Sequence, residues 1–391
     1  MFFDNGAGAQ IPKIALDAVQ DHLTHRSVQR GGRYRQSREV DEAIQRARES
    51  VAVFLNAREP EEIAFGMNAT SFIRIVSVAI AETLGERREF VVSDLDHEAN
   101  VATWMALEKC GAQIRWWRMR EDGRLHVEDL APVLNSRTRL VACTMASNAL
   151  GSLVDVKSAA QMAHAAGAEL FLDAVHYAPH GPLDVQEIDC DYLVCSGYKI
   201  FAPHMGFLYG KRAALDALPT FREDFIPDRV PMKIEVGTFV YENVAGMAAA
   251  LKYLETLSDR ISTSAAPPAR RAKLTRVMEA IRHYEASLSS EMLRCLSEIE
   301  GVTIYGIRDE GMISLRVPTI CFNVRGTDPG AVATHFGQHE IGIRDGNMYS
   351  PRLLARLGIP VTGAVRASLV HYNSAEEIER FVSVLKMLKP N

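Results

Sequence analysis

Two apolar segments typical of buried strands each lead into a residue that could do chemistry. Residues 169–172 deliver Asp173, and residues 192–195 lead through Ser196 to Lys199. Because ligands of α/β sheets bind at the carboxyl ends of strands, we expect Asp173 and Lys199 to lie at one edge of one sheet. A lysine amine can form a Schiff base with pyridoxal 5'-phosphate (PLP), and a carboxylate can face the ring nitrogen of this coenzyme. Taken singly, the two residues could be a helix cap and a solvated lysine, but together they favour a PLP site.

The elements that must position this pair alternate along the first 210 residues. We expect strands at 89–93, 114–119, 139–144, 169–174, 191–196 and 206–210, and helices at 71–84, 100–110 and 157–166. This alternation is typical of an α/β layered domain with a mostly parallel sheet.

The pattern changes near residue 241, where two long helices begin. We expect these helices at 241–257 and 271–300. Short strands should follow at 303–306 (TIYG), 313–317 (ISLRV) and 319–324 (TICFNV), with further helices at 329–338 and 375–388. We predict that residues 15–255 form a large PLP-binding domain. Residues 1–14 and 256–391 are predicted to form a smaller α+β domain.

Composition excludes several classes of protein. The 391 residues carry 44 Lys and Arg against 49 Asp and Glu, a net charge of −5, so we expect no nucleic-acid partner. The most apolar helical segment, 72–84, contains two charged residues and is far shorter than the ~20 residues of a membrane span, so we expect no membrane partner. We expect no signal peptide, and the scattered cysteines read as buried thiols of a cytoplasmic protein. Pro179 interrupts the one helically spaced histidine pair, His176 and His180, so no metal is predicted.

The segments DAVH at 173–176 and SGYK at 196–199 resemble the class V aminotransferase family, in particular its cysteine desulfurase-like branch. The resemblance extends along nearly the whole chain. It implies the PLP-dependent transferase fold type I, with a large domain built on a mostly parallel sheet of seven strands and a smaller C-terminal α+β domain. It also implies a homodimer with shared active sites.

Further segments carry the same resemblance. GMNAT at 66–70 resembles the phosphate-binding turn, DHEAN at 96–100 the segment whose histidine stacks on the coenzyme ring, and SNALG at 147–151 a loop that meets the ring hydroxyl or the substrate. EVGT at 235–238 resembles a turn that reaches the phosphate of the neighbouring subunit. DNGAG at 4–8 resembles an N-terminal segment near the substrate entrance.

The resemblance thereby assigns roles to individual residues. It implies that Lys199, Asp173 and His97 are catalytic. The cofactor-binding residues that it implies are Ala69, Thr70, His97, Asn148, Asp173, His176, Ser196, Tyr198, Lys199 and Thr238. The substrate-binding residues are Asn148, Arg366, Tyr349 and Arg344. Among them, Arg366 resembles the arginine that grips the substrate α-carboxylate, for which a planar fork of donors is suited.

Three positions depart from the desulfurase pattern. Tyr349 stands where desulfurases carry the mobile cysteine that attacks the substrate sulfur, and the cysteine nearest in sequence is Cys321. A persulfide mechanism needs a thiolate at that place, and a phenol cannot replace it. Tyr198 stands where desulfurases place a histidine, and His176 where some relatives use glutamine.

The resemblance implies a PLP-dependent class V aminotransferase-like enzyme that acts on an amino acid, a small-molecule substrate, through a Schiff base and an α-carbanion, with Lys199 as general base. We favour a cysteine desulfurase-like β-elimination, that is, a lyase without an enzyme persulfide. The alternatives are an aminotransferase or an amino-acid epimerase or racemase. In a different class, the chain could be a catalytically degenerate PLP-binding partner protein. These residues leave the substrate and the fate of the carbanion open.

Overall fold

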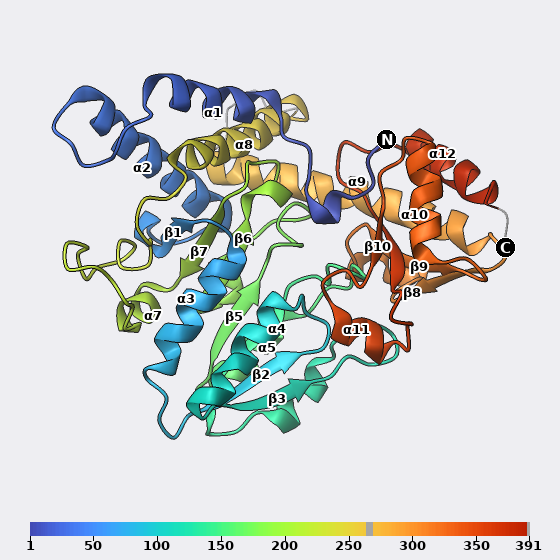
Figure 1. Ribbon diagram of the computed structural model, residues 1–391, viewed down its shortest axis with the longest axis horizontal. Helices are drawn as coiled ribbons and strands as arrows, with labels where there is room; N and C mark the ends of the chain where they lie inside the picture. The colour runs from blue at the N-terminus through green and yellow to red at the C-terminus, as the bar shows by residue number, and fades with distance from the viewer. Residues whose placement is uncertain (263–268, 389–391) are drawn as a thin grey trace.

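The computed structural model describes residues 1–262 and 269–388, and its largest element is a sheet of seven strands (Figure 1). The strand order is β1-β7-β6-β5-β4-β2-β3. The strands are β1 (Ile63–Gly66), β2 (Glu89–Ser93), β3 (Gln113–Trp117), β4 (Thr138–Thr144), β5 (Glu169–Asp173), β6 (Tyr192–Ser196) and β7 (Gly206–Gly210). The five strands from β6 to β3 run parallel to one another, whereas β7 and β1 are antiparallel to their neighbours.

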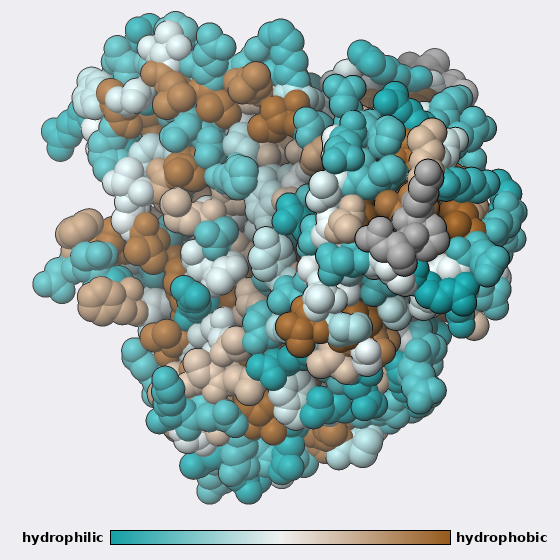
Figure 2. All heavy atoms as spheres, turned by 45° about the vertical axis from the view of Figure 1, so that its right-hand side comes forward, coloured by the Kyte–Doolittle hydropathy of each residue, from teal (hydrophilic) through white to brown (hydrophobic). Residues whose placement is uncertain are grey.

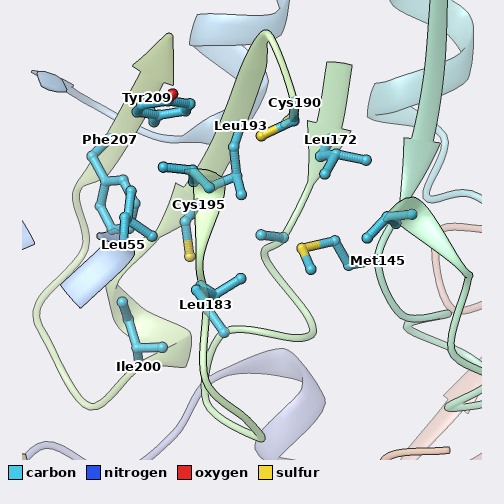
Figure 3. Packing of buried hydrophobic residues seen from close by; sticks show 14 of the residues in the cluster. Leu55, Met145, Leu172, Leu183, Cys190, Leu193, Cys195, Ile200, Phe207 and Tyr209 are labelled. Atoms are coloured by element: carbon cyan, nitrogen blue, oxygen red, sulfur yellow. The ribbon is translucent and has the colours of Figure 1, made fainter. Parts of the chain in front are cut away.

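Helices cover both faces of this sheet, which explains why its central strands are apolar on both sides. One face packs against α3 (Ala69–Ala81) and α4 (Ala99–Met105). The other packs against α2 (Arg35–Leu55), α5 (Val156–Ala165) and α8 (Tyr241–Arg260). Figure 3 shows the core on this second face, where leucines of β5 and β6 pack beside Phe207 and Tyr209 of β7. The remaining helices around the sheet are α1 (Lys13–His25), α6 (Val185–Ile188) and α7 (Arg212–Ala217).

A second, antiparallel sheet lies in the C-terminal part, with the strand order β10-β11-β9-β8. Its strands are β8 (Val302–Tyr305), β9 (Thr319–Val324), β10 (Arg344–Gly346) and β11 (Ala364–Ser368). Its core includes side chains of α9 (Arg270–Ser297), α10 (Pro329–Gln338) and α12 (Ala375–Lys386), and Phe3 at the start of the chain. The N-terminus therefore lies beside this sheet (Figure 1). The short helix α11 (Pro351–Arg356) follows β10.

The predicted fold class is confirmed: a mainly parallel sheet of seven strands and a small antiparallel C-terminal sheet make up an α/β fold. The predicted domain limits, 15–255 against 1–14 with 256–391, remain a prediction. The strand predicted at ISLRV is wrong. Residues Glu310–Leu315 form a 3-10 turn, which Asp309 caps by accepting a hydrogen bond from the Gly311 backbone at 2.8 Å. The helix predicted at 100–110 tightens into a 3-10 turn at Ala106.

The surface of the molecule is mixed in character. On the face shown in Figure 2, hydrophilic residues dominate and hydrophobic residues form small separate groups. The most exposed large aromatic side chains are Phe221 and Phe225, at 86% and 80%. Within residues 1–262 and 269–388, no helix is both long enough and apolar enough to cross a membrane.

Candidate active site

A cavity opens at the carboxyl ends of β4, β5 and β6. Every predicted cofactor-binding residue except Thr238 lines it, although they come from segments far apart in the chain. These residues are Ala69, Thr70, His97, Asn148, Asp173, His176, Ser196, Tyr198 and Lys199. The structure therefore brings the predicted pair, Asp173 and Lys199, into one enclosed space.

Lys199 ends a 3-10 turn that follows β6, and its side chain is buried. Burial lowers the pKa of its amine to about 8, and the nearby charge of Arg366 acts in the same direction. Asp173, the last residue of β5, is also buried and accepts a hydrogen bond from the Val175 backbone at 2.9 Å. Burial raises the pKa of the Asp173 carboxyl, whereas the Val175 N–H and the charge of Lys199 act against this rise. The site thus holds an amine and a carboxyl group whose neutral forms are both favoured by burial.

The start of α3 forms the side of the cavity that suits a phosphate. Asn68 caps the helix by accepting a hydrogen bond from the Ser71 backbone at 2.8 Å, and the Ala69 N–H points to the Ser196 hydroxyl at 3.3 Å. N–H groups at a helix start attract anions. β7 approaches this turn so closely that a Cβ at Gly206 would lie 2.5 Å from the Asn68 carbonyl carbon. Only glycine fits there.

His97 and Tyr349 form a stacked pair, with ring centroids 5.7 Å apart and an interplanar angle of 30°. Burial and the charges of Lys199 and Arg366 lower the pKa of His97 to about 4, so its ring is neutral. A neutral imidazole that lines the cavity can stack on an aromatic coenzyme ring. Tyr349 is 57% exposed and lies on the outer side of His97.

The loop that carries Tyr349 is held in an uncommon backbone conformation. Met348 and Tyr349 both have positive φ angles, 54° and 57°, which non-glycine residues rarely adopt. Asn148 fixes the loop, since its Nδ2 donates to the Met348 carbonyl at 2.6 Å and its Oδ1 accepts from the Ser350 hydroxyl at 3.0 Å. The Glu98 N–H donates to the Tyr349 carbonyl at 2.8 Å. Asn148 therefore supports the loop, and its predicted contact with coenzyme or substrate remains a prediction.

Arg366 lies on β11, is 1% exposed and does not line the cavity. Its Nη1 donates to the Asn148 carbonyl at 2.8 Å, and its Nη2 donates to Asp4 at 3.0 Å. Its Nε–H has no hydrogen-bond partner among the described residues. Arg344 also binds Asp4, at 2.7 Å from its Nη2. The two arginines predicted to bind substrate are thus joined by one carboxylate.

Thr238 lies on the surface outside the cavity, where its hydroxyl accepts a hydrogen bond from Gln29 at 2.7 Å. It does not contribute to the cavity of its own chain. Its predicted role, contact with the phosphate of a neighbouring subunit, remains a prediction.

Tyr198 and His176 also line the cavity. The Tyr198 ring stacks on the His204 ring, with centroids 4.9 Å apart. The Lys199 amine lies 5.8 Å from the centroid of the Tyr198 ring. His176 Nε2 lies 2.9 Å from the Thr319 hydroxyl, whereas His180 is engaged with Glu285 at 2.7 Å. Among the residues that the structure describes, no group of three or more histidine, cysteine or acidic side chains could hold a metal ion.

All six cysteines are free thiols, and none lines the cavity. Cys190 and Cys195 lie within the packed core beside the sheet (Figure 3). Cys321 is buried on β9, and burial raises the pKa of its thiol to about 12.

Sequence reasoning gave no individual role to Asp4, Asp96 and Thr144. Asp96 is buried beside Ser93 and Asn100, and burial raises its pKa to about 7. Thr144 ends β4 and lines the cavity. The signal in the sequence that could have identified Thr144 was its place at the end of an apolar strand. Asp4 and Asp96 lie within segments that carried the family resemblance.

The residues present fit PLP by their chemistry. A buried amine can react with the aldehyde, a buried carboxyl can face the ring nitrogen, a neutral imidazole can stack on the ring, and the start of α3 can receive the phosphate. Thr70 and Ser196 add hydroxyls to the same cavity.

Comparisons with known proteins agree with this arrangement. The family model "Aminotransferase class-V" matches residues 1–381. A probable cysteine desulfurase of Synechocystis sp. is 33% identical over 99% of this chain and 90% of its own length. An aminotransferase-like protein of Gibberella zeae is 32% identical over 99% of this chain and 94% of its own length. The apo structure of a cysteine desulfurase from Thermococcus onnurineus NA1 superposes with a TM-score of 0.88 and 26% identity, covering 99% of this chain and 94% of that one. The chain therefore belongs to the aminotransferase class-V family, whose enzymes depend on PLP.

Proposed function

We propose that this protein is a PLP-dependent enzyme that removes a β-substituent from an amino acid, as a lyase without an enzyme persulfide. The observation that carries the proposal is the burial of Lys199 with Asp173 in one cavity beside the start of α3. The similarity to proteins named cysteine desulfurases supports the choice of β-elimination.

The side chains of the cavity have distinct tasks in this proposal. When bound, PLP supplies an electron sink for the carbanion at the substrate α-carbon. Lys199 removes the α-proton, for which its lowered pKa suits it. Asp173 would hold the ring nitrogen in its protonated form, and His97 would stack on the ring. Arg366 orients the substrate α-carboxylate through the donors that Asp4 and Asn148 leave free.

The placement of the thiols supports a reaction without an enzyme persulfide. The side chain stacked on His97, which lines the cavity, is the phenol of Tyr349. The buried thiols of Cys143, Cys190, Cys195 and Cys321 have raised pKa values, so they hold little thiolate. The free thiols also support the predicted cytoplasmic location.

We also propose a homodimer in which Thr238 reaches the cavity of the second subunit. Thr238 does not line its own cavity and is close in sequence to Val236, an apolar residue with 63% exposure. Phe221 and Phe225 are exposed in the preceding loop. Burying these apolar side chains against a second copy would remove them from water.

A second candidate function is transamination, because one 32% identical relative is named an aminotransferase-like protein. The same first proton transfer by Lys199 serves an aminotransferase, an epimerase or racemase, and a lyase. A degenerate PLP-binding partner protein would have no need to keep Lys199, Asp173, His97 and Arg366 together.

Replacement of Lys199 by alanine should abolish the covalent capture of PLP by borohydride and lower turnover by at least about 100-fold, because the nucleophile and base are one amine. Mass spectrometry of the reduced protein measures the capture, and Lys157→Ala, at an exposed lysine paired with Glu187, is the control. Full capture in the Lys199 variant would show that another residue holds the coenzyme.

A panel of amino acids separates the candidate reactions. We expect a 2-oxo acid and ammonia to form from an amino acid with a β-leaving group, without any added 2-oxo acid. Product that requires an added 2-oxo acid would favour transamination, and α-proton exchange with inversion alone would favour an epimerase or racemase.

Alkylation of accessible thiols should leave turnover within about twofold of the untreated enzyme, because no cysteine lines the cavity. Mass spectrometry after incubation with cysteine should detect no persulfide on the protein. The variant Tyr349→Phe removes the hydroxyl and keeps the ring. It serves as the control for an effect of the Tyr349 loop on turnover. A persulfide on any cysteine would contradict this part of the proposal.

The rate of PLP incorporation into the PLP-free protein should rise about tenfold per pH unit below pH 8 and level off above it, because only the neutral amine reacts. Stopped-flow absorbance measures this rate. Arg366→Gln should shift the midpoint upward, since the positive charge of Arg366 lowers the pKa of Lys199. A rate that keeps rising to pH 10 would show an unperturbed lysine.

A further inference from the structure

Two arginines lie opposite each other on neighbouring strands of the small sheet. In the antiparallel pairing of β10 with β11, Arg344 lies directly opposite Arg366. Like charges in that position destabilise a sheet unless an opposite charge lies between them. The feature therefore requires a compensating anion.

Asp4 is this anion. Its carboxylate accepts hydrogen bonds from Arg344 Nε at 3.0 Å and Nη2 at 2.7 Å, and from Arg366 Nη2 at 3.0 Å. The three side chains form an Arg–Asp–Arg triad. Arg344 binds the Asp4 carboxylate through two N–H groups, Nε and Nη2, and such bidentate ion pairs are strong.

The N-terminal segment is built to hold Asp4 in this place. Asp4 forms a parallel bridge with Ser368 of β11, and the Gly6 N–H donates to the Ser368 hydroxyl at 2.6 Å. A Cβ at Gly6 would come within 3.0 Å of the Arg366 guanidinium carbon, so bare backbone lies against that guanidinium. The Asn5 side chain donates to the Ser368 carbonyl at 2.8 Å.

The triad carries two positive charges and one negative charge, which leaves one positive charge for a ligand. The buried Nε–H of Arg366 has no partner among the described residues, whereas Arg344 binds Asp4 through its Nε and Nη2. A substrate α-carboxylate would use the remaining donors of Arg366. A second carboxylate would find Arg344 occupied and would face the charge of Asp4.

We propose that Asp4 is a specificity-determining residue that restricts the site to amino acids with one carboxylate and an uncharged side chain. The inference rests on the proposed function, which makes an amino acid the ligand of Arg366. It adds the substrate class, and it assigns the exclusion of dicarboxylic amino acids to a residue of the N-terminal segment.

The test uses two probes that lack an α-hydrogen, so that Lys199 cannot remove a proton from either. They are 2-aminoisobutyric acid and 2-methylaspartic acid, which differ by one carboxylate. Calorimetric titration of the PLP-loaded protein measures both dissociation constants. The wild type should bind 2-aminoisobutyric acid at least about tenfold more tightly, and Asp4→Asn should shift the ratio toward 2-methylaspartic acid by about tenfold or more, because Arg344 becomes available.

Three further variants make the outcome specific. Asp17→Asn removes a carboxylate that is paired with Lys13 on an exposed helix and should leave the ratio unchanged. The double variant Asp4→Asn with Arg344→Gln should lose the gain for 2-methylaspartic acid. If Asp4→Asn does not fold, Asp4→Ser tests the same shift.

The outcomes separate this inference from the proposed function. Equal binding of both probes by the wild type, or an unchanged ratio in a folded Asp4 variant, would overturn the role of Asp4 alone. Failure of the PLP-loaded wild type to bind either probe would overturn the proposed function as well.

Discussion

An amine and a carboxyl group are buried together at the carboxyl edge of the large sheet, and the chemistry of the site depends on their mutual influence. Removal from water disfavours the charged form of each group, which lowers the pKa of Lys199 and raises that of Asp173. Each charge partly offsets this effect on the other. Burial thus favours the neutral amine of Lys199, the form that can act as a general base.

The rest of the cavity is arranged so that this pair keeps its place. β5 and β6 are neighbours in the parallel sheet, so Asp173 and the turn that carries Lys199 emerge side by side. The cores on both faces of the sheet fix these strands. The start of α3 and the close passage of Gly206 complete the side of the cavity opposite His97.

Contacts with the C-terminal sheet and the N-terminal segment set the outer part of the site. Asn148 spans to the loop of Met348 and Tyr349, where two consecutive left-handed residues are held by hydrogen bonds. Asp4 joins Arg344 and Arg366 in the same region. The N-terminal segment and the C-terminal part of the chain thus lie next to the cavity, which is lined by residues within 69–199.

The sequence by itself determined the fold class, most strands of the large sheet and the pair Asp173 and Lys199, because apolar runs and the polar residues after them are local signals. The resemblance to the family supplied the other predicted residues of the cavity. Tertiary structure decided what these signals could not. The strands that carry Arg344 and Arg366 are short or contain charge, so their pairing became visible only in the folded sheet. The engagement of Asn148 with the Tyr349 loop joins residues about 200 positions apart. Asp4 and Arg366 are separated by 362 positions, and a contact at such a distance leaves no periodic trace in a single sequence.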